Sequence, residues 1–87
     1  MADVTVYTTS YCPYCVQAKR LLTRKGIPYT EIDVTEDVDL RQKMVAESGR
    51  RTVPQIFIDG QPIGGFDELH ELETSGRLDE LVGAGAS

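Results

Sequence analysis

Cysteine and histidine, the usual ligands of structural zinc, are scarce in this 87-residue chain, which contains two cysteines and one histidine. A structural zinc site takes four ligands, usually cysteine and histidine. Cys12 and Cys15 form a C-x-x-C pair, but there is no second such pair and His70 is the only histidine. The carboxylates are not spaced like a ligand set. We therefore expect no metal site.

Long apolar runs are also lacking. No run approaches the roughly 20 apolar residues of a membrane-spanning helix. The start, Met1-Ala2-Asp3-Val4, has neither the basic region nor the long apolar region of an export signal. We therefore expect a cytoplasmic protein without a membrane partner.

Basic residues are outnumbered, since nine Lys and Arg against 14 Asp and Glu give a net charge of −5. A nucleic-acid-binding surface is basic, so we expect no nucleic-acid partner. Of the nine basic residues, only Arg77 lies beyond residue 52. Four basic residues follow the cysteines closely, and we interpret them as solvated surface charge: Lys19, Arg20, Arg24 and Lys25.

The two cysteines occur together in Ser10-Tyr11-Cys12-Pro13-Tyr14-Cys15, between a β-rich run and a helical pattern. A strand-to-helix turn here places Cys12 near the helix N-cap, and Pro13 suits the first helical position. Free N–H groups and the helix dipole stabilise a thiolate at Cys12, so its pKa should fall below the free-thiol value of roughly 8.5. Cys15 lies on the same helix face within reach of Cys12. We predict a reversible disulfide in which Cys12 attacks and Cys15 resolves.

An inert, packed cysteine pair is the alternative interpretation. Disulfides in cytoplasmic proteins are usually transient and catalytic rather than structural. A cysteine at the start of a helix is also in a position that favours the thiolate. Both arguments favour a redox-active dithiol.

The hydrophobic pattern predicts an α/β domain of order β-α-β-α-β-β-α, with a four-stranded mixed sheet flanked by helices. Strands are expected at residues 4–7, 29–34, 55–58 and 61–64. Helices are expected from the Cys12 turn to Gly26, from an N-cap at Thr35 to Gly49, and from an N-cap at Asp67 to Gly76. Residues 78–82 suggest a final helical turn. We expect one domain over residues 1–82 and a frayed tail over residues 83–87.

The connections suggest how the strands pair. A strand, a helix and a strand with short joins imply a right-handed crossover and a parallel pair. Asp59-Gly60 is a strong signal for a two-residue hairpin between the third and fourth strands. Pro62 cannot donate a ladder hydrogen bond, so the fourth strand should lie at a sheet edge.

Three motifs together resemble the glutaredoxin family: Cys12-Pro13-Tyr14-Cys15, Thr52-Val53-Pro54 and Gly64-Gly65-Phe66-Asp67. The resemblance covers nearly the whole chain, because the motifs are widely spread and the order of elements matches. It implies a thioredoxin fold and a dithiol enzyme that uses glutathione as its reducing co-substrate. It also implies a set of glutathione-binding residues: Tyr14, Arg41, Thr52, Val53, Pro54, Gly65, Phe66 and Asp67.

Within that set, the resemblance gives several residues a part in binding. Pro54 would be a cis-proline facing the cysteines, and Val53 would lend its backbone N–H and C=O to the cysteinyl unit of glutathione. N–H groups of the Gly64-Gly65 segment would meet the γ-glutamyl carboxylate, which agrees with anion binding at helix starts. Asp67 would meet the γ-glutamyl amine.

The remaining assignments leave alternatives open. Arg41, or else Arg50 or Arg51, would pair with the glycine carboxylate of glutathione. Tyr14 would lie along the bound peptide. From the residues alone, Thr52-Val53-Pro54 also reads as an ordinary strand entry with a trans proline.

The function implied by this resemblance is glutathione-dependent reduction of protein disulfides and of glutathione mixed disulfides by a monomer. Its partners would be glutathione and disulfide-containing or glutathionylated proteins. A small thioredoxin-like donor recycled by thioredoxin reductase is one alternative. A scaffold in which two chains bridge an iron-sulfur cluster through Cys12 and glutathione is another. The chain departs from the family at Thr9, where glutaredoxins commonly carry a lysine.

Overall fold

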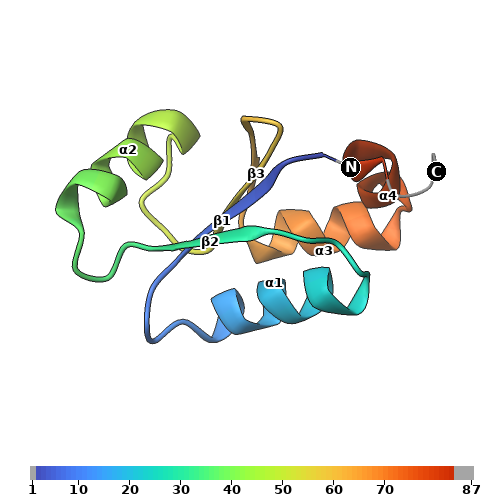
Figure 1. The fold of residues 1–87 in the computed structure, drawn as a ribbon, viewed down its shortest axis with the longest axis horizontal. Coiled ribbons are helices and arrows are strands. Elements are labelled where there is room, and N and C mark those ends of the chain that lie inside the picture. Colours follow the sequence, from blue (N-terminus) through green and yellow to red (C-terminus); the bar gives the residue numbers. More distant parts are fainter. Residues whose placement is uncertain (1, 84–87) are drawn as a thin grey trace.

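The computed structural model describes residues 2–83 and has a mixed four-stranded sheet at its centre (Figure 1). The strands are β1 (Val4–Thr8), β2 (Thr30–Asp33), β3 (Gln55–Ile58) and β4 (Gln61–Gly64). The helices are α1 (Pro13–Arg24), α2 (Val38–Ser48), α3 (Phe66–Thr74) and α4 (Arg77–Val82). The predicted order of elements is confirmed, with α4 in place of the expected final helical turn. The tail expected over 83–87 lies outside the described residues from 84 onward.

The strand order in the sheet is β2-β1-β3-β4. The β1 strand pairs parallel with β2 and antiparallel with β3, and β3 pairs antiparallel with β4. This confirms the predicted parallel pair and places Pro62 in an edge strand. The hairpin between β3 and β4 turns at Asp59 and Gly60, whose φ values of 52° and 81° are both left-handed, as a tight two-residue turn requires.

Helices cover both faces of the sheet, with α1 and α3 on one side and α2 on the other (Figure 1). The larger core lies under α1, α3 and α4, and its buried members are Val4, Val6, Ala18, Leu21, Leu22, Ile27, Ile56, Ile58, Leu69, Leu78 and Val82. The smaller core lies under α2 and contains Tyr7, Val34, Met44 and Phe57. Adjacent residues of β1 and β3 contribute to opposite cores because side chains alternate along a strand. This is the thioredoxin fold.

Two predicted helix caps are wrong. Thr35 does not cap α2, because the helix begins only at Val38 and the Thr35 hydroxyl oxygen instead accepts from the Ser10 N–H at 2.8 Å. The cap is Asp37, whose carboxylate accepts from the Leu40 N–H at 3.0 Å. Asp67 does not cap α3 either, since the helix already begins at Phe66 with Gly65 as its N-cap.

No helix within residues 2–83 is long and apolar enough to cross a membrane.

Candidate functional site

Cys12 is the N-cap of α1, as the sequence predicted. Its backbone is extended, with φ −136° and ψ 99°, and Pro13 occupies the first helical position. The Cys15 N–H donates to the Cys12 sulfur at 3.1 Å, so this sulfur takes the part that a serine or aspartate oxygen takes at other helix starts. A negative charge on Cys12 would therefore meet a backbone donor and the positive end of the helix dipole.

The two cysteines form a disulfide, with their Cα atoms 5.1 Å apart. They differ in their access to solvent. Cys12 is partly exposed, whereas Cys15 is 1% exposed and belongs to the inward-facing side of α1. An external thiol can therefore reach the disulfide only at Cys12.

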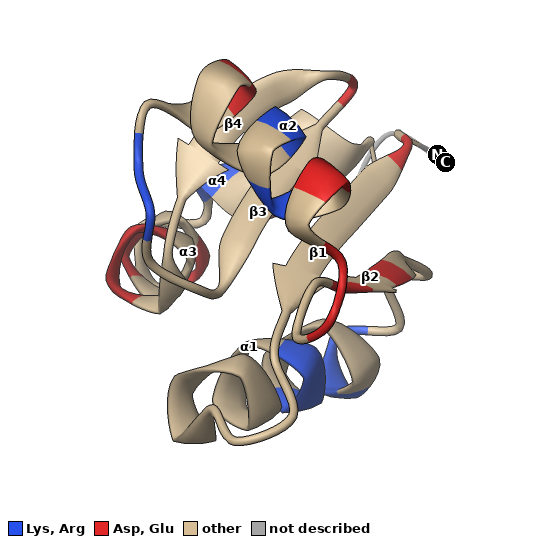
Figure 2. Ribbon diagram, turned by 90° about the vertical axis from the view of Figure 1, so that its left-hand side faces the viewer, with Lys and Arg blue, Asp and Glu red and all other residues tan. Residues whose placement is uncertain are grey.

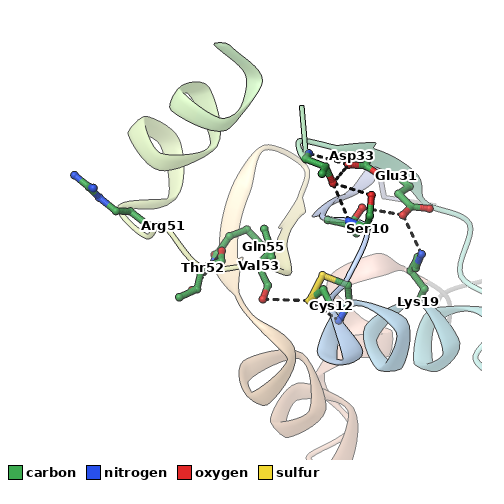
Figure 3. The surroundings of a disulfide bond; sticks show 12 residues. Ser10, Cys12, Lys19, Glu31, Asp33, Arg51, Thr52, Val53 and Gln55 are labelled. Carbon is green, nitrogen blue, oxygen red and sulfur yellow. Dashed lines mark hydrogen bonds and ion pairs between the residues drawn. A yellow bond between two sulfur atoms is a disulfide. The ribbon is translucent and has the colours of Figure 1, made fainter. Parts of the chain in front are cut away.

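The segment before β3 lies against the disulfide (Figure 3). The Cys12 sulfur is 3.6 Å from the Val53 carbonyl oxygen, and the Val53–Pro54 peptide bond is cis, as the resemblance implied. The buried Gln55 side chain holds this segment in place through Thr52. Its side-chain amide donates to the Thr52 carbonyl at 2.9 Å and to the Thr52 hydroxyl at 3.2 Å.

A groove of about 260 Å³ opens beside this segment and the start of α3. Its lining residues are Tyr14, Arg50, Thr52, Val53, Pro54, Gly65, Phe66, Asp67 and Glu68. The Tyr14 and Phe66 rings stack with centroids 6.2 Å apart and join α1 to α3 across one end. Seven of the eight residues named from the resemblance as glutathione-binding therefore line one groove.

Arg41 is the exception. It lies on α2 and donates to the Arg51 carbonyl at 3.3 Å, and both arginines line a separate hollow on that helix. Arg50 is the arginine that lines the groove instead. The sequence alone did not separate these three cations, because all lie within a few residues of the Thr52-Val53-Pro54 segment or on the preceding helix.

Glu68 is a groove residue that the sequence reasoning missed. Its carboxylate accepts from the Gly65 N–H at 2.7 Å and pairs with the Arg50 guanidinium at 2.8 Å. The Gly65 N–H and then the Arg50 side chain hold the pKa of Glu68 below its usual value. The spacing Gly65-x-x-Glu68 is that of a capping box, and it could have revealed this contact.

The glycines at the start of α3 are needed for this arrangement. Gly64 has a φ of +124°, and a Cβ there would lie 2.5 Å from the Glu68 carboxylate. A Cβ on Gly65 would lie 3.3 Å from the Pro54 carbonyl oxygen. The positive φ at Gly64 favours glycine in the join between β4 and α3, whereas at Gly65 the close Pro54 carbonyl leaves little room for a side chain. Phe66 and Asp67, in the first turn of α3, have N–H groups without intrahelical acceptors.

Within residues 2–83 the structure gathers no group of three or more His, Cys, Asp or Glu side chains placed to hold a metal ion. What it does gather is a disulfide-bonded cysteine pair, the segment before β3 and a helix start. This arrangement suits disulfide exchange with a small peptide-like thiol.

The sequence matches the glutaredoxin family model over residues 4–63. The chain belongs to the glutaredoxin family. It is 49% identical over 82 residues to glutaredoxin 3 of Escherichia coli, a match that covers 94% of this chain and 99% of that protein. It is accordingly a thiol-disulfide oxidoreductase, and Cys12 and Cys15 are its redox-active pair.

Solved glutaredoxin structures agree with this fold. The solution structure of glutaredoxin from Brucella melitensis is 49% identical, with a TM-score of 0.85, and the match covers 98% of this chain and 92% of that one. The crystal structure of a buckwheat glutaredoxin–glutathione complex is 30% identical with a TM-score of 0.86, covering 95% of this chain and 78% of that chain.

Proposed function

We propose that this glutaredoxin uses glutathione to reduce protein disulfides and glutathione mixed disulfides in the cytoplasm, as a monomer. The observation that carries the proposal is the unequal access to the two sulfurs beside a groove. Cys12 is partly exposed and carries the helix-start environment that favours a thiolate, whereas Cys15 is 1% exposed. This difference supports separate parts for the two cysteines.

Reduction of a protein disulfide begins when the Cys12 thiolate attacks one substrate sulfur. The substrate S–S bond breaks, a mixed disulfide forms on Cys12, and the other substrate sulfur leaves as a thiolate that takes up a proton. Cys15 then loses its proton and attacks the Cys12 sulfur. This step releases the fully reduced substrate and forms the Cys12–Cys15 disulfide.

Two glutathione molecules return the enzyme to the dithiol. The first attacks the accessible Cys12 sulfur, which frees Cys15 as a thiol. The second attacks the sulfur of the bound glutathione, which frees Cys12 and yields glutathione disulfide. For a glutathionylated protein, Cys12 takes the glutathionyl group directly and one further glutathione releases it, so Cys15 is not required.

Glutathione would lie in the groove beside Cys12. The Val53 backbone would pair with its cysteinyl unit, and the N–H groups of Phe66 and Asp67 at the helix start suit the γ-glutamyl carboxylate. The Asp67 carboxylate suits the γ-glutamyl amine, and Tyr14 suits a position along the peptide. Arg50 is the best-placed cation for the glycine carboxylate. The similarity to the buckwheat glutaredoxin–glutathione complex supports this assignment.

A comparison of two recycling systems tests the proposal against the thioredoxin-like alternative. The same protein disulfide is supplied with glutathione, glutathione reductase and NADPH, or with thioredoxin reductase and NADPH. We expect fast NADPH consumption with the glutathione system, since glutaredoxin potentials of about −200 to −230 mV lie near that of the glutathione pool. We expect little NADPH consumption with thioredoxin reductase. Faster turnover with thioredoxin reductase would overturn the proposal.

A further inference from the structure

The basic residues on α1 are of two kinds. Lys19 and Lys25 are paired with carboxylates from elsewhere in the fold, namely Glu31, Glu73 and Asp79. Arg20 and Arg24 are exposed, and neither has a carboxylate within ion-pair distance among residues 2–83. The sequence shows four similar cations, but the structure leaves only these two arginines free on the helix.

The two free arginines lie in a line that starts near the disulfide. Val16, Arg20 and Arg24 are spaced four residues apart and so share one face of α1 over about 12 Å. Val16 is 43% exposed and follows Cys12 by one turn. This face borders a hollow of about 450 Å³ between α1 and β2, lined by Val16, Lys19, Arg20, Thr23, Arg24, Tyr29 and Glu31.

Glu31 is the one acid in this hollow, and its charge is already compensated. Its carboxylate accepts from Lys19 at 2.9 Å and from the buried Thr8 hydroxyl at 2.8 Å (Figure 3). The Lys19 contact lowers the pKa of Glu31, with a smaller effect from Thr8, so the pair stays ionised and carries no net charge. The net charge of the hollow is that of Arg20 and Arg24.

The hollow lies on the opposite flank of α1 from the groove beside Cys12. The groove is bounded by the start of α3 and the segment before β3, whereas the hollow is bounded by the edge strand β2. The two flanks also differ in charge, since α1 carries basic residues and α3 acidic ones (Figure 2). A protein attached to Cys12 can therefore extend along α1 without entering the groove.

We propose that the hollow between α1 and β2 is a docking surface for protein substrates whose disulfide is flanked by an acidic segment, with Arg20 and Arg24 pairing its carboxylates. The inference rests on the proposed reduction of protein disulfides. Charge complementarity selects the occupant, because the two arginines on α1 attract carboxylates, while the chain's net charge of −5 disfavours acidic partners overall. Apolar contact with Val16 and Tyr29 would add to the two ion pairs.

The test compares three peptides that contain the same disulfide with acidic, neutral or basic flanks. The variant reverses both charges, Arg20→Glu with Arg24→Glu. The matched control is Lys43→Glu with Arg77→Glu, which makes the same change in net charge at exposed cations on α2 and α4. Turnover of a small, uncharged hydroxyalkyl disulfide with glutathione serves as the reference assay, because this substrate has no flanking segment that could dock.

We expect the wild type to prefer the acidic peptide at low salt. The α1 variant should lose about tenfold in kcat/KM for that peptide, while the control loses little. At about 1 M salt, where the Debye length is about 3 Å, the preference should largely disappear. Turnover of the small disulfide should be unchanged in both variants.

An equal loss in the α1 variant and the control would show that only net charge matters and would overturn the docking surface. An equal rate for all three peptides with the wild type would overturn it too. Failure of the proposed function would look different, since the wild type would then not turn over the small disulfide with glutathione.

Discussion

Cys15 donates its backbone N–H to the Cys12 sulfur at 3.1 Å, while its own sulfur is buried. In the proposed reaction, Cys15 would therefore serve Cys12 in two ways, as a hydrogen-bond donor and as a resolving thiol. The N–H contact depends only on the backbone, so it survives replacement of the Cys15 side chain. This makes the two contributions separable by mutation.

The Cys12 thiolate should be stabilised mainly by the helix start, because the family's usual lysine is replaced by Thr9. We expect a Cys12 pKa below about 8.5, and a further decrease in the Thr9→Lys variant. Each unit of decrease corresponds to roughly 1.4 kcal/mol, and the decrease should be smaller at high salt. The pH dependence of Cys12 alkylation, with Cys15 replaced by Ser in both proteins, measures it. An unchanged alkylation pKa at low salt would show that residue 9 does not act on the site.

Asp67 should matter for glutathione rather than for disulfide chemistry. Asp67→Asn keeps the size of the side chain but removes the charge proposed to meet the γ-glutamyl amine. We expect the KM for glutathione to rise by about tenfold, in keeping with a charge-assisted contact of about 1.5 kcal/mol, with little change in kcat. Glu71→Gln, at an exposed position on the same helix, is the control. Equal effects of the two substitutions would place the amine elsewhere.

Glu68 should stabilise the fold in a pH-dependent way. Its folded-state pKa is lowered by the Gly65 N–H and then by Arg50, so its contribution is complete above the unfolded-state pKa of about 4.3 and is lost as the pH falls below it. We expect Glu68→Ala, which removes the acceptor for the Gly65 N–H, to lower the free energy of unfolding at neutral pH by about 1 kcal/mol, mostly through the cap because exposed ion pairs contribute little. Denaturant unfolding at several pH values should show the difference from wild type shrinking in acid. A difference that is constant with pH would contradict this account.

Gln55 should position the segment that faces Cys12. It is 1% exposed and donates twice to Thr52, but its Oε1 atom has no hydrogen-bond partner. Gln55→Met removes the donors and the unsatisfied oxygen together, so we expect a change in unfolding free energy of less than about 1 kcal/mol. The KM for glutathione should nevertheless rise, because Thr52 and Val53 lose their support. An unchanged KM in a folded variant would show that the segment is held by other contacts.

Much of the fold could be predicted from the sequence because its signals are local. Alternating β-branched residues, Asp59-Gly60 and Pro62 mark the strands, the hairpin and the sheet edge. The helix caps were harder, because a cap is decided by competition between nearby acceptors. The Thr35 hydroxyl oxygen accepts from the Ser10 N–H instead, and the Asp37 carboxylate accepts from the first turn of α2.

The residues of the candidate site were predictable where short motifs determine the backbone conformation. They were less predictable where the partner of a long side chain depends on the tertiary structure. The residues of Thr52-Val53-Pro54 and Gly65-Phe66-Asp67 line one groove. Among the arginines, the sequence could not show that Arg41 turns toward the Arg51 carbonyl while Arg50 reaches Glu68. For the same reason the sequence did not show which cations of α1 form ion pairs, since their carboxylate partners lie more than ten positions away.

In the proposed mechanism Cys12 alone attacks the substrate, and Cys15 only resolves the mixed disulfide. The most direct test is the rate of deglutathionylation of a glutathionylated protein by the Cys12→Ser and Cys15→Ser variants, with glutathione present. A serine hydroxyl is hardly ionised at neutral pH, so Cys12→Ser should fall to the uncatalysed rate. Cys15→Ser should retain deglutathionylation and lose only the reduction of protein disulfides. Equal loss of deglutathionylation in both variants would contradict the account.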